Sequence, residues 1–138
     1  MKHHVILKNI ALILIPFMFM FGGYVLFHGE VSPGGGFQGG AIWATAICLY
    51  AVIFSVEKAK KLISPKTLRI MAASGCIIYA LFGFAAIALG HNFLDYSALS
   101  SNPHLGQKFG ILGIEIGVQL TVFAVLTMIF FRIASQED

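Results

Sequence analysis

Charged residues are scarce in this sequence. Asp, Glu, Lys and Arg make up only 11% of its 138 residues, whereas 58% are hydrophobic, and the mean hydropathy is +0.87. A soluble domain usually has about 25% charged residues, so the composition excludes a water-exposed globule and favours a membrane protein. Because a spanning helix takes about 20 residues, the chain has room for four or five spans and for no large extramembrane catalytic domain.

Recognisable catalytic and metal-binding patterns are also lacking. The sequence contains no Cys-x-x-Cys, no legible Ser-His-Asp set and no paired carboxylates, so we predict neither an enzyme nor a bound metal or cofactor. Its two cysteines, Cys48 and Cys76, stand in apolar stretches and are expected to be small core residues. Its nine basic residues are too few and too clustered to follow a nucleic acid backbone, so no nucleic acid partner is expected.

What the sequence does contain is four long apolar runs, at about 10–27, 37–56, 70–90 and 109–131. Each run has the 18 to 23 residues that a helix needs to cross the hydrocarbon of a bilayer. We therefore predict an all-α polytopic membrane protein, a single four-helix transmembrane subunit over residues 1–138. A glycine-rich break is expected between its first two helices.

The basic residues predict the orientation of these spans. Eight of the nine Lys and Arg residues lie before the first run, between the second and third, or after the fourth, and only Lys108 lies on the other side. The positive-inside tendency then places both termini and a connecting loop at 57–69 in the cytoplasm. The first run follows Lys2 and Lys8, as a signal peptide would, but it is too long for a signal core and is expected to be a retained anchor. Residues 64–66 predict a turn before the third helix.

Small residues recur at three- and four-residue steps in the second, third and fourth runs. Helices in lipid associate by close backbone approach over such stripes, so we expect packing within the chain and against other subunits. The stripes are Gly40, Ala44, Cys48, Ala51 and Ser55; Ala72, Cys76, Gly83, Ala86 and Gly90; and Gly106, Gly110, Gly113, Gly117, Thr121 and Ala124.

The connection between the first two runs, HGEVSPGGGFQGG at 28–40, is too rich in glycine to be helical throughout. It is either a flexible surface hairpin or a packed break that faces a neighbouring subunit or an ion path. The flanking aromatic residues Phe37 and Trp43 favour the packed break, since irregular backbone at membrane depth is tolerated where protein or a watery cavity surrounds it. The candidate functional residues here are Pro33, Gly34, Gly35, Gly36 and Phe37, with His28 and Glu30 as titratable neighbours.

Glu115 is the only acid well inside a predicted span. Placing a charge at the centre of a membrane helix costs about 2.5–3.5 kcal/mol, so such residues usually face a cavity or a partner. Helical spacing puts Glu115 on one face with Gln119, with Lys108 on the same side and the glycine stripe of 110–117 roughly opposite. Two interpretations remain open: a structural pair with Lys108 or a neighbouring helix, and a proton or cation relay.

The PGGGFQGG motif between the first two of four spans, followed by the basic loop and the helix that carries Glu115, resembles the B subunits of the Mrp (also called Mnh or Sha) multisubunit sodium/proton antiporters. The resemblance covers essentially the whole chain. Members of this family often have another residue, commonly His, where this chain has Glu30. Pro33 and Phe37 are the motif positions that the resemblance marks for function.

This resemblance implies a small helical subunit of an assembly of several membrane proteins in the bacterial cell membrane. Such assemblies exchange cytoplasmic sodium for external protons, and their proton-pumping modules belong to the large A and D subunits. The expected partners are therefore those subunits, the other small membrane subunits, sodium ions, protons and lipid. The alternatives are a non-conducting assembly subunit, or a subunit of a related membrane-bound hydrogenase or complex I-like redox assembly.

Overall fold

The computed structural model describes residues 2–29, 33–100 and 102–136. In these ranges the chain forms helices joined by short connections and contains no β-strand, which confirms the predicted all-α class. The elements are α1 (Lys2–Phe27), α2 (Gly36–Phe54), α3 (Val56–Leu62), α4 (Pro65–Ala88), the 3-10 helix η1 (Tyr96–Leu99) and α5 (Pro103–Ala134).

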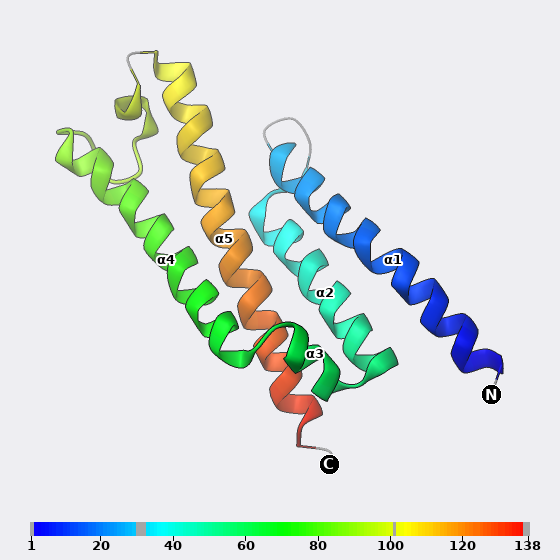
Figure 1. The fold of residues 1–138 in the computed structure, drawn as a ribbon. Coiled ribbons are helices and arrows are strands. Elements are labelled where there is room, and N and C mark those ends of the chain that lie inside the picture. Colours follow the sequence, from blue (N-terminus) through cyan, green and yellow to red (C-terminus); the bar gives the residue numbers. More distant parts are fainter. Residues whose placement is uncertain (1, 30–32, 101, 137–138) are drawn as a thin grey trace.

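Four of these helices, α1, α2, α4 and α5, are long and apolar enough to cross a membrane. They coincide with the four predicted runs, although α2 and α4 each end two residues before the predicted run does. They lie side by side in the order α4, α5, α2, α1 (Figure 1). The start of α1, the end of α5 and the short helix α3 lie at one end of the molecule, which we call the basic end. The end of α1, the start of α2 and residues 89–100 lie at the opposite end. Large apolar side chains such as Phe17 and Met20 are exposed on the outer faces, as expected of helices surrounded by lipid.

The connection between the second and third spans differs from the prediction. We expected residues 57–69 to be a loop, but this segment holds most of α3 and the start of α4. Ser55 ends α2 with a φ of 122° and begins α3, where its Oγ accepts a hydrogen bond from the N–H of Lys58 at 3.4 Å. Ser64 then caps α4 by accepting from the N–H of Thr67 at 3.1 Å, with proline at the first helical position. The third helix therefore begins five residues earlier than predicted.

The fourth helix also begins earlier than predicted. Asn102 caps α5 by accepting a hydrogen bond from the N–H of His104 at 3.1 Å, and Pro103 follows the cap directly. The helix therefore includes Lys108, which we had placed in a connecting segment.

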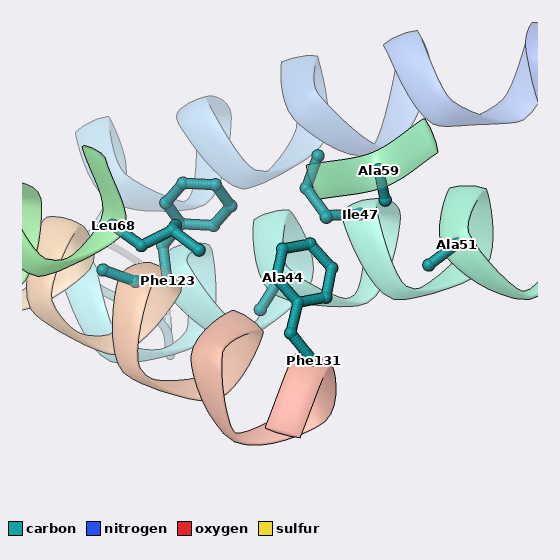
Figure 2. Packing of buried hydrophobic residues seen from close by; sticks show 8 residues of the cluster. Ala44, Ile47, Ala51, Ala59, Leu68, Phe123 and Phe131 are labelled. Carbon is teal, nitrogen blue, oxygen red and sulfur yellow. The ribbon is translucent and has the colours of Figure 1, made fainter. Parts of the chain in front are cut away.

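The buried core lies towards the basic end, where α3 covers the other helices. Trp43 of α2 connects α1 to this core. Its Nε1 donates a hydrogen bond to the backbone oxygen of Phe19 in α1 at 2.8 Å, and its ring packs edge-on against Phe123 of α5. The core residues shown in Figure 2 include Ala44, Ile47, Ala51, Ala59, Leu68, Phe123 and Phe131.

The small-residue stripes are used largely inside the chain. A Cβ on Gly40 would lie 2.7 Å from the backbone oxygen of Gln119, and one on Gly117 would lie 2.8 Å from that of Gly75. These glycines therefore allow α5 to approach α2 on one side and α4 on the other. The expectation of two core cysteines is wrong for Cys76, which is exposed, while Cys48 is half-buried. Cys76 is exposed because α4 turns Gly75, rather than Cys76, towards Gly117 of α5.

Candidate functional site

The glycine-rich connection packs against Glu115 of α5. A Cβ on Gly35 would lie 2.6 Å from Oε1 of Glu115, and a Cβ on Gly29 would lie 2.8 Å from its Oε2. Any larger residue at either position would therefore displace the carboxylate. In its described part the connection is a packed break, the interpretation that the sequence favoured, and the group that it surrounds is an acid.

Two glycines allow this close approach for different reasons. Gly34 has a φ of +155°, a backbone conformation that residues with a side chain rarely adopt. Gly36 is the first residue of α2 and is buried. A Cβ there would lie 2.8 Å from the carbonyl carbon and 3.0 Å from the Cα of Glu115. The start of α2 therefore lies directly against the backbone of α5.

Gln119 lies one helical turn beyond Glu115 and is almost completely buried, with 1% of its surface exposed. Neither its Nε2 nor its Oε1 has a hydrogen-bond partner among the described residues. The amide lies beside Gly39, whose added Cβ would be 3.0 Å from Nε2 and 2.7 Å from the backbone oxygen of Gly22. A buried polar group without a partner costs about 1–3 kcal/mol. In a native structure it therefore needs an explanation, such as a bound water or ion.

Glu115 lines two cavities. One, of about 240 Å³, is otherwise walled mainly by apolar side chains of α1 and α5 and includes Lys108. The other, of about 390 Å³, is lined by residues 34–38 and Val118. The carboxylate thus lies where a cavity containing a lysine and a cavity walled by glycine backbone meet.

The aromatic residue of the motif does not pack among the glycines. Phe37 lies at the rim of the second cavity and is 64% exposed, and Pro33 is exposed as well. Both motif residues therefore face away from the rest of the chain, towards lipid or another protein.

The remaining sequence-predicted residues lie at the same end of the molecule. His28 stacks on Tyr24 at a ring-centroid distance of 4.0 Å and donates from Nδ1 to the backbone oxygen of that residue at 3.1 Å. Glu30 falls outside the described residues. The contribution of Gly22 and Gly39 to the surroundings of Gln119 was not predicted, since a glycine inside an apolar run gives no sign of what lies beside it.

Outside the spans, one acid has a clear local environment. Asp95 accepts hydrogen bonds from the N–H and hydroxyl of Ser97 and lies 3.1 Å from Nδ1 of His91. These contacts, the Ser97 hydroxyl first, lower the pKa of the Asp95 carboxyl. The group fixes the turn before α5 and lies apart from Glu115.

Comparison with known proteins now adds to this geometry. Residues 6–128 match the family model described as "Domain related to MnhB subunit of Na+/H+ antiporter". The chain belongs to the MnhB family. It is also 32% identical over 140 residues to the "Putative antiporter subunit mnhB2" of Staphylococcus haemolyticus strain JCSC1435, covering 99% of both chains. The protein of the same name in Staphylococcus aureus strain Newman is 30% identical over 136 residues, which cover 91% of this chain and 96% of the relative.

Membership of the MnhB family confirms the resemblance drawn from the PGGGFQGG motif. The family description names an antiporter, which favours a transport assembly over the redox assembly that the sequence left open. The four apolar helices of this MnhB-family chain agree with a protein that resides in a membrane.

Proposed function

We propose that this chain is an integral-membrane subunit of a multisubunit antiporter that exchanges cytoplasmic sodium for external protons and works only in complex. Its family and its four apolar helices support this proposal. The partners would be the large proton-pumping A and D subunits and the other small membrane subunits. The bacterial cell membrane would be its location, with both termini in the cytoplasm because the basic end carries eight of the nine Lys and Arg residues.

The amide of Gln119, which has no hydrogen-bond partner among the described residues, lies one helical turn from Glu115. This observation supports a direct role in transport. A carboxylate binds a proton or a monovalent cation, and an amide oxygen can ligate a cation or hold a water molecule. Four residues apart on α5, the two groups lie about 6 Å apart along the helix axis. A water at Gln119 would extend a proton path from Glu115 towards the interior of the membrane.

The position of Glu115 along α5 gives this path a direction. Glu115 lies 12 residues after the start of α5, or about 18 Å along the helix, in the half of the molecule away from the basic end. In the proposed orientation it is therefore closer to the external side. Lys108 lines the same cavity, so its positive charge would disfavour a second cation beside Glu115.

Antiport measured in everted membrane vesicles tests this role. The complete assembly would be produced in cells without their own sodium/proton antiporters, and sodium-dependent loss of the pH gradient would be recorded. We expect Glu115→Gln to reduce antiport strongly while the subunits still purify together. Glu57→Gln is the matched control, because Glu57 is an exposed acid in the first turn of α3 at the basic end. Full antiport by the Glu115→Gln assembly would show that the carboxylate is not part of an ion path.

A second role, docking of a neighbouring subunit, is favoured by the exposed ring of Phe37. An exposed aromatic side chain beside an exposed proline suits an interface anchor. We expect Phe37→Ala to reduce co-purification of the other subunits, whereas Phe17→Ala, which alters an exposed aromatic of α1, should not. If Phe37→Ala disrupts assembly while Glu115→Gln is neutral, the chain is an assembly subunit that conducts nothing.

A further inference from the structure

A pocket at the basic end brings together three cationic side chains from three different helices. Lys60 of α3, Arg69 of α4 and Arg132 of α5 line one cavity of about 380 Å³. The pocket is at the opposite end of the molecule from Glu115. Its remaining lining is mostly apolar and comprises Pro65, Met128, Phe131 and Ser135.

Hydrogen bonds hold the lysine in this pocket. The ammonium group of Lys60 donates to Oγ of Ser135 at 2.7 Å, and the Ser135 hydroxyl donates to the backbone oxygen of Phe131 at 2.6 Å. Glu57 lies 3.5 Å from the same ammonium group and partly balances its charge. These hydrogen bonds connect α3 to the last turn of α5. They therefore hold Lys60 at the end of α5 that carries Arg132, and both side chains line the pocket.

Counted over the described residues, the two arginines give the pocket a positive excess. No acidic side chain among the described residues lies within ion-pair distance of Arg69 or Arg132. Guanidinium groups bind phosphate oxygens in a bidentate manner and remain charged at any physiological pH. Two such groups that share a cavity with an ammonium group therefore suit a phosphate-bearing anion.

The walls of the pocket indicate which kind of phosphate it suits. Met128 and Phe131 belong to the last turns of α5, and Pro65 begins α4, so the cavity lies where the spanning helices reach the membrane surface. A soluble phosphate gains nothing from apolar walls, whereas a phospholipid places its headgroup beside cations and its first methylenes beside such side chains. Basic pockets between helix ends on the cytoplasmic side of membranes commonly bind anionic headgroups.

We propose that this pocket binds an anionic phospholipid, with the phosphate at Arg69, Arg132 and Lys60 and the start of an acyl chain against Met128 and Phe131. The bound lipid neutralises the excess positive charge and joins the ends of α3, α4 and α5. This proposal depends on the helices spanning a membrane, and it is independent of any ion path at Glu115.

Photo-crosslinking of lipids to the purified assembly tests the proposal. Phosphatidylglycerol and phosphatidylcholine with the same photoactivatable acyl chain would each be incorporated into nanodiscs, and labelled peptides of this chain would be identified by mass spectrometry. We expect phosphatidylglycerol to label the peptides that carry Met128 or Phe131 on the order of a hundredfold more than phosphatidylcholine does, since the pocket holds three basic residues and each contributes on the order of a fivefold preference for an anionic lipid. Equal labelling by the two lipids, or none, would overturn the proposal.

Charge-matched variants locate the site. Arg69→Gln with Arg132→Gln should reduce labelling by phosphatidylglycerol about tenfold. Lys58→Gln with Lys61→Gln removes the same charge from exposed positions of α3 outside the pocket and should change labelling less than twofold. An equal decrease in both double variants would mean that only the general surface charge matters, which contradicts a site.

A charge-conserving double variant and competition by inorganic phosphate distinguish the remaining explanations of the labelling. Arg69→Lys with Arg132→Lys keeps the charge but loses the bidentate hydrogen bonds, so labelling should decrease less than in the glutamine variant. An unchanged Tm and unchanged co-purification of the glutamine variant show that its loss of labelling does not come from misfolding. An excess of inorganic phosphate should leave labelling unchanged. Displacement of the lipid by inorganic phosphate would assign the pocket to a soluble phosphate and overturn the lipid proposal.

Discussion

Replacing Gly36 by alanine tests the contact between the glycine-rich break and α5 with a single added methyl group. The added Cβ would collide with the backbone oxygen of Glu115 and would lie 2.8 Å from its carbonyl carbon and 3.0 Å from its Cα, whereas carbon atoms normally approach to about 3.5–4.0 Å. The start of α2 would therefore have to move by at least about 1 Å. No flexible side chain can absorb this displacement, because the atoms that the methyl group meets belong to the backbone.

The expected cost follows from this geometry. Overpacking of a well-packed site typically costs about 1–3 kcal/mol, and a clash with backbone belongs at the upper end of this range. The higher helix propensity of alanine offsets less than about 1 kcal/mol of this cost, since Gly36 is the first residue of α2 and not an interior one. We therefore expect a net destabilisation of about 2 kcal/mol, and a shift of the Glu115 carboxylate from its place.

Gly23→Ala is the matched control. Gly23 lies inside α1, and a Cβ there would meet no atom within 4 Å, so this substitution should be neutral or slightly stabilising. Thermal unfolding of the detergent-purified assembly and antiport in everted vesicles would be measured for both variants. A Gly36→Ala assembly with wild-type Tm and wild-type antiport, or a Gly23→Ala assembly that is equally impaired, would refute the packing described here.

Two further predictions concern Gln119 and Asp95. Gln119→Leu should lower antiport, because leucine cannot hold the proposed water, without lowering the thermal stability of the assembly, since leucine leaves no buried polar group unsatisfied; a loss of stability with full antiport would contradict the assigned role. The pKa of Asp95 is lowered by Ser97 and His91, so the stabilisation that its carboxylate gives to segment 91–100 is present above the ordinary aspartate pKa of 3.8 and is lost as the pH falls below it. The amide hydrogens of this segment should therefore be protected from exchange at pH 5 and lose that protection only in stronger acid. Asp95→Asn should remove this pH dependence. A loss of protection between pH 7 and pH 5 in the native chain would contradict the assignment.

The parts of the structure that depend on local pattern were predictable from the sequence. Long apolar runs identified the four membrane helices because length and hydropathy alone determine whether a helix can cross a bilayer. Helical spacing placed Glu115 and Gln119 on the face of α5 opposite its glycine stripe, and the structure shows Gly117 against α4 and Glu115 against the start of α2.

The parts that depend on how the helices are arranged were not predictable in the same way. The glycine-rich connection and Glu115 are about 80 residues apart in the sequence, and they meet only because α2 rather than α4 lies beside that face of α5. Five of the residues at 57–69 are basic, so this segment was interpreted only as a cytoplasmic loop. The short helix α3 was missed because the prediction did not consider Ser55 and Ser64 as helix caps. The pocket of Lys60, Arg69 and Arg132 depends on the position of α3 and was missed for the same reason.

The four long helices stand in a single row, in the order α4, α5, α2, α1 (Figure 1). A single row of helices has two outer faces and does not enclose a channel. If water reaches Glu115, this chain supplies only one wall of its path, and a neighbouring subunit of the proposed assembly supplies the facing wall. Substitutions that alter conduction should then arise in pairs across the two proteins.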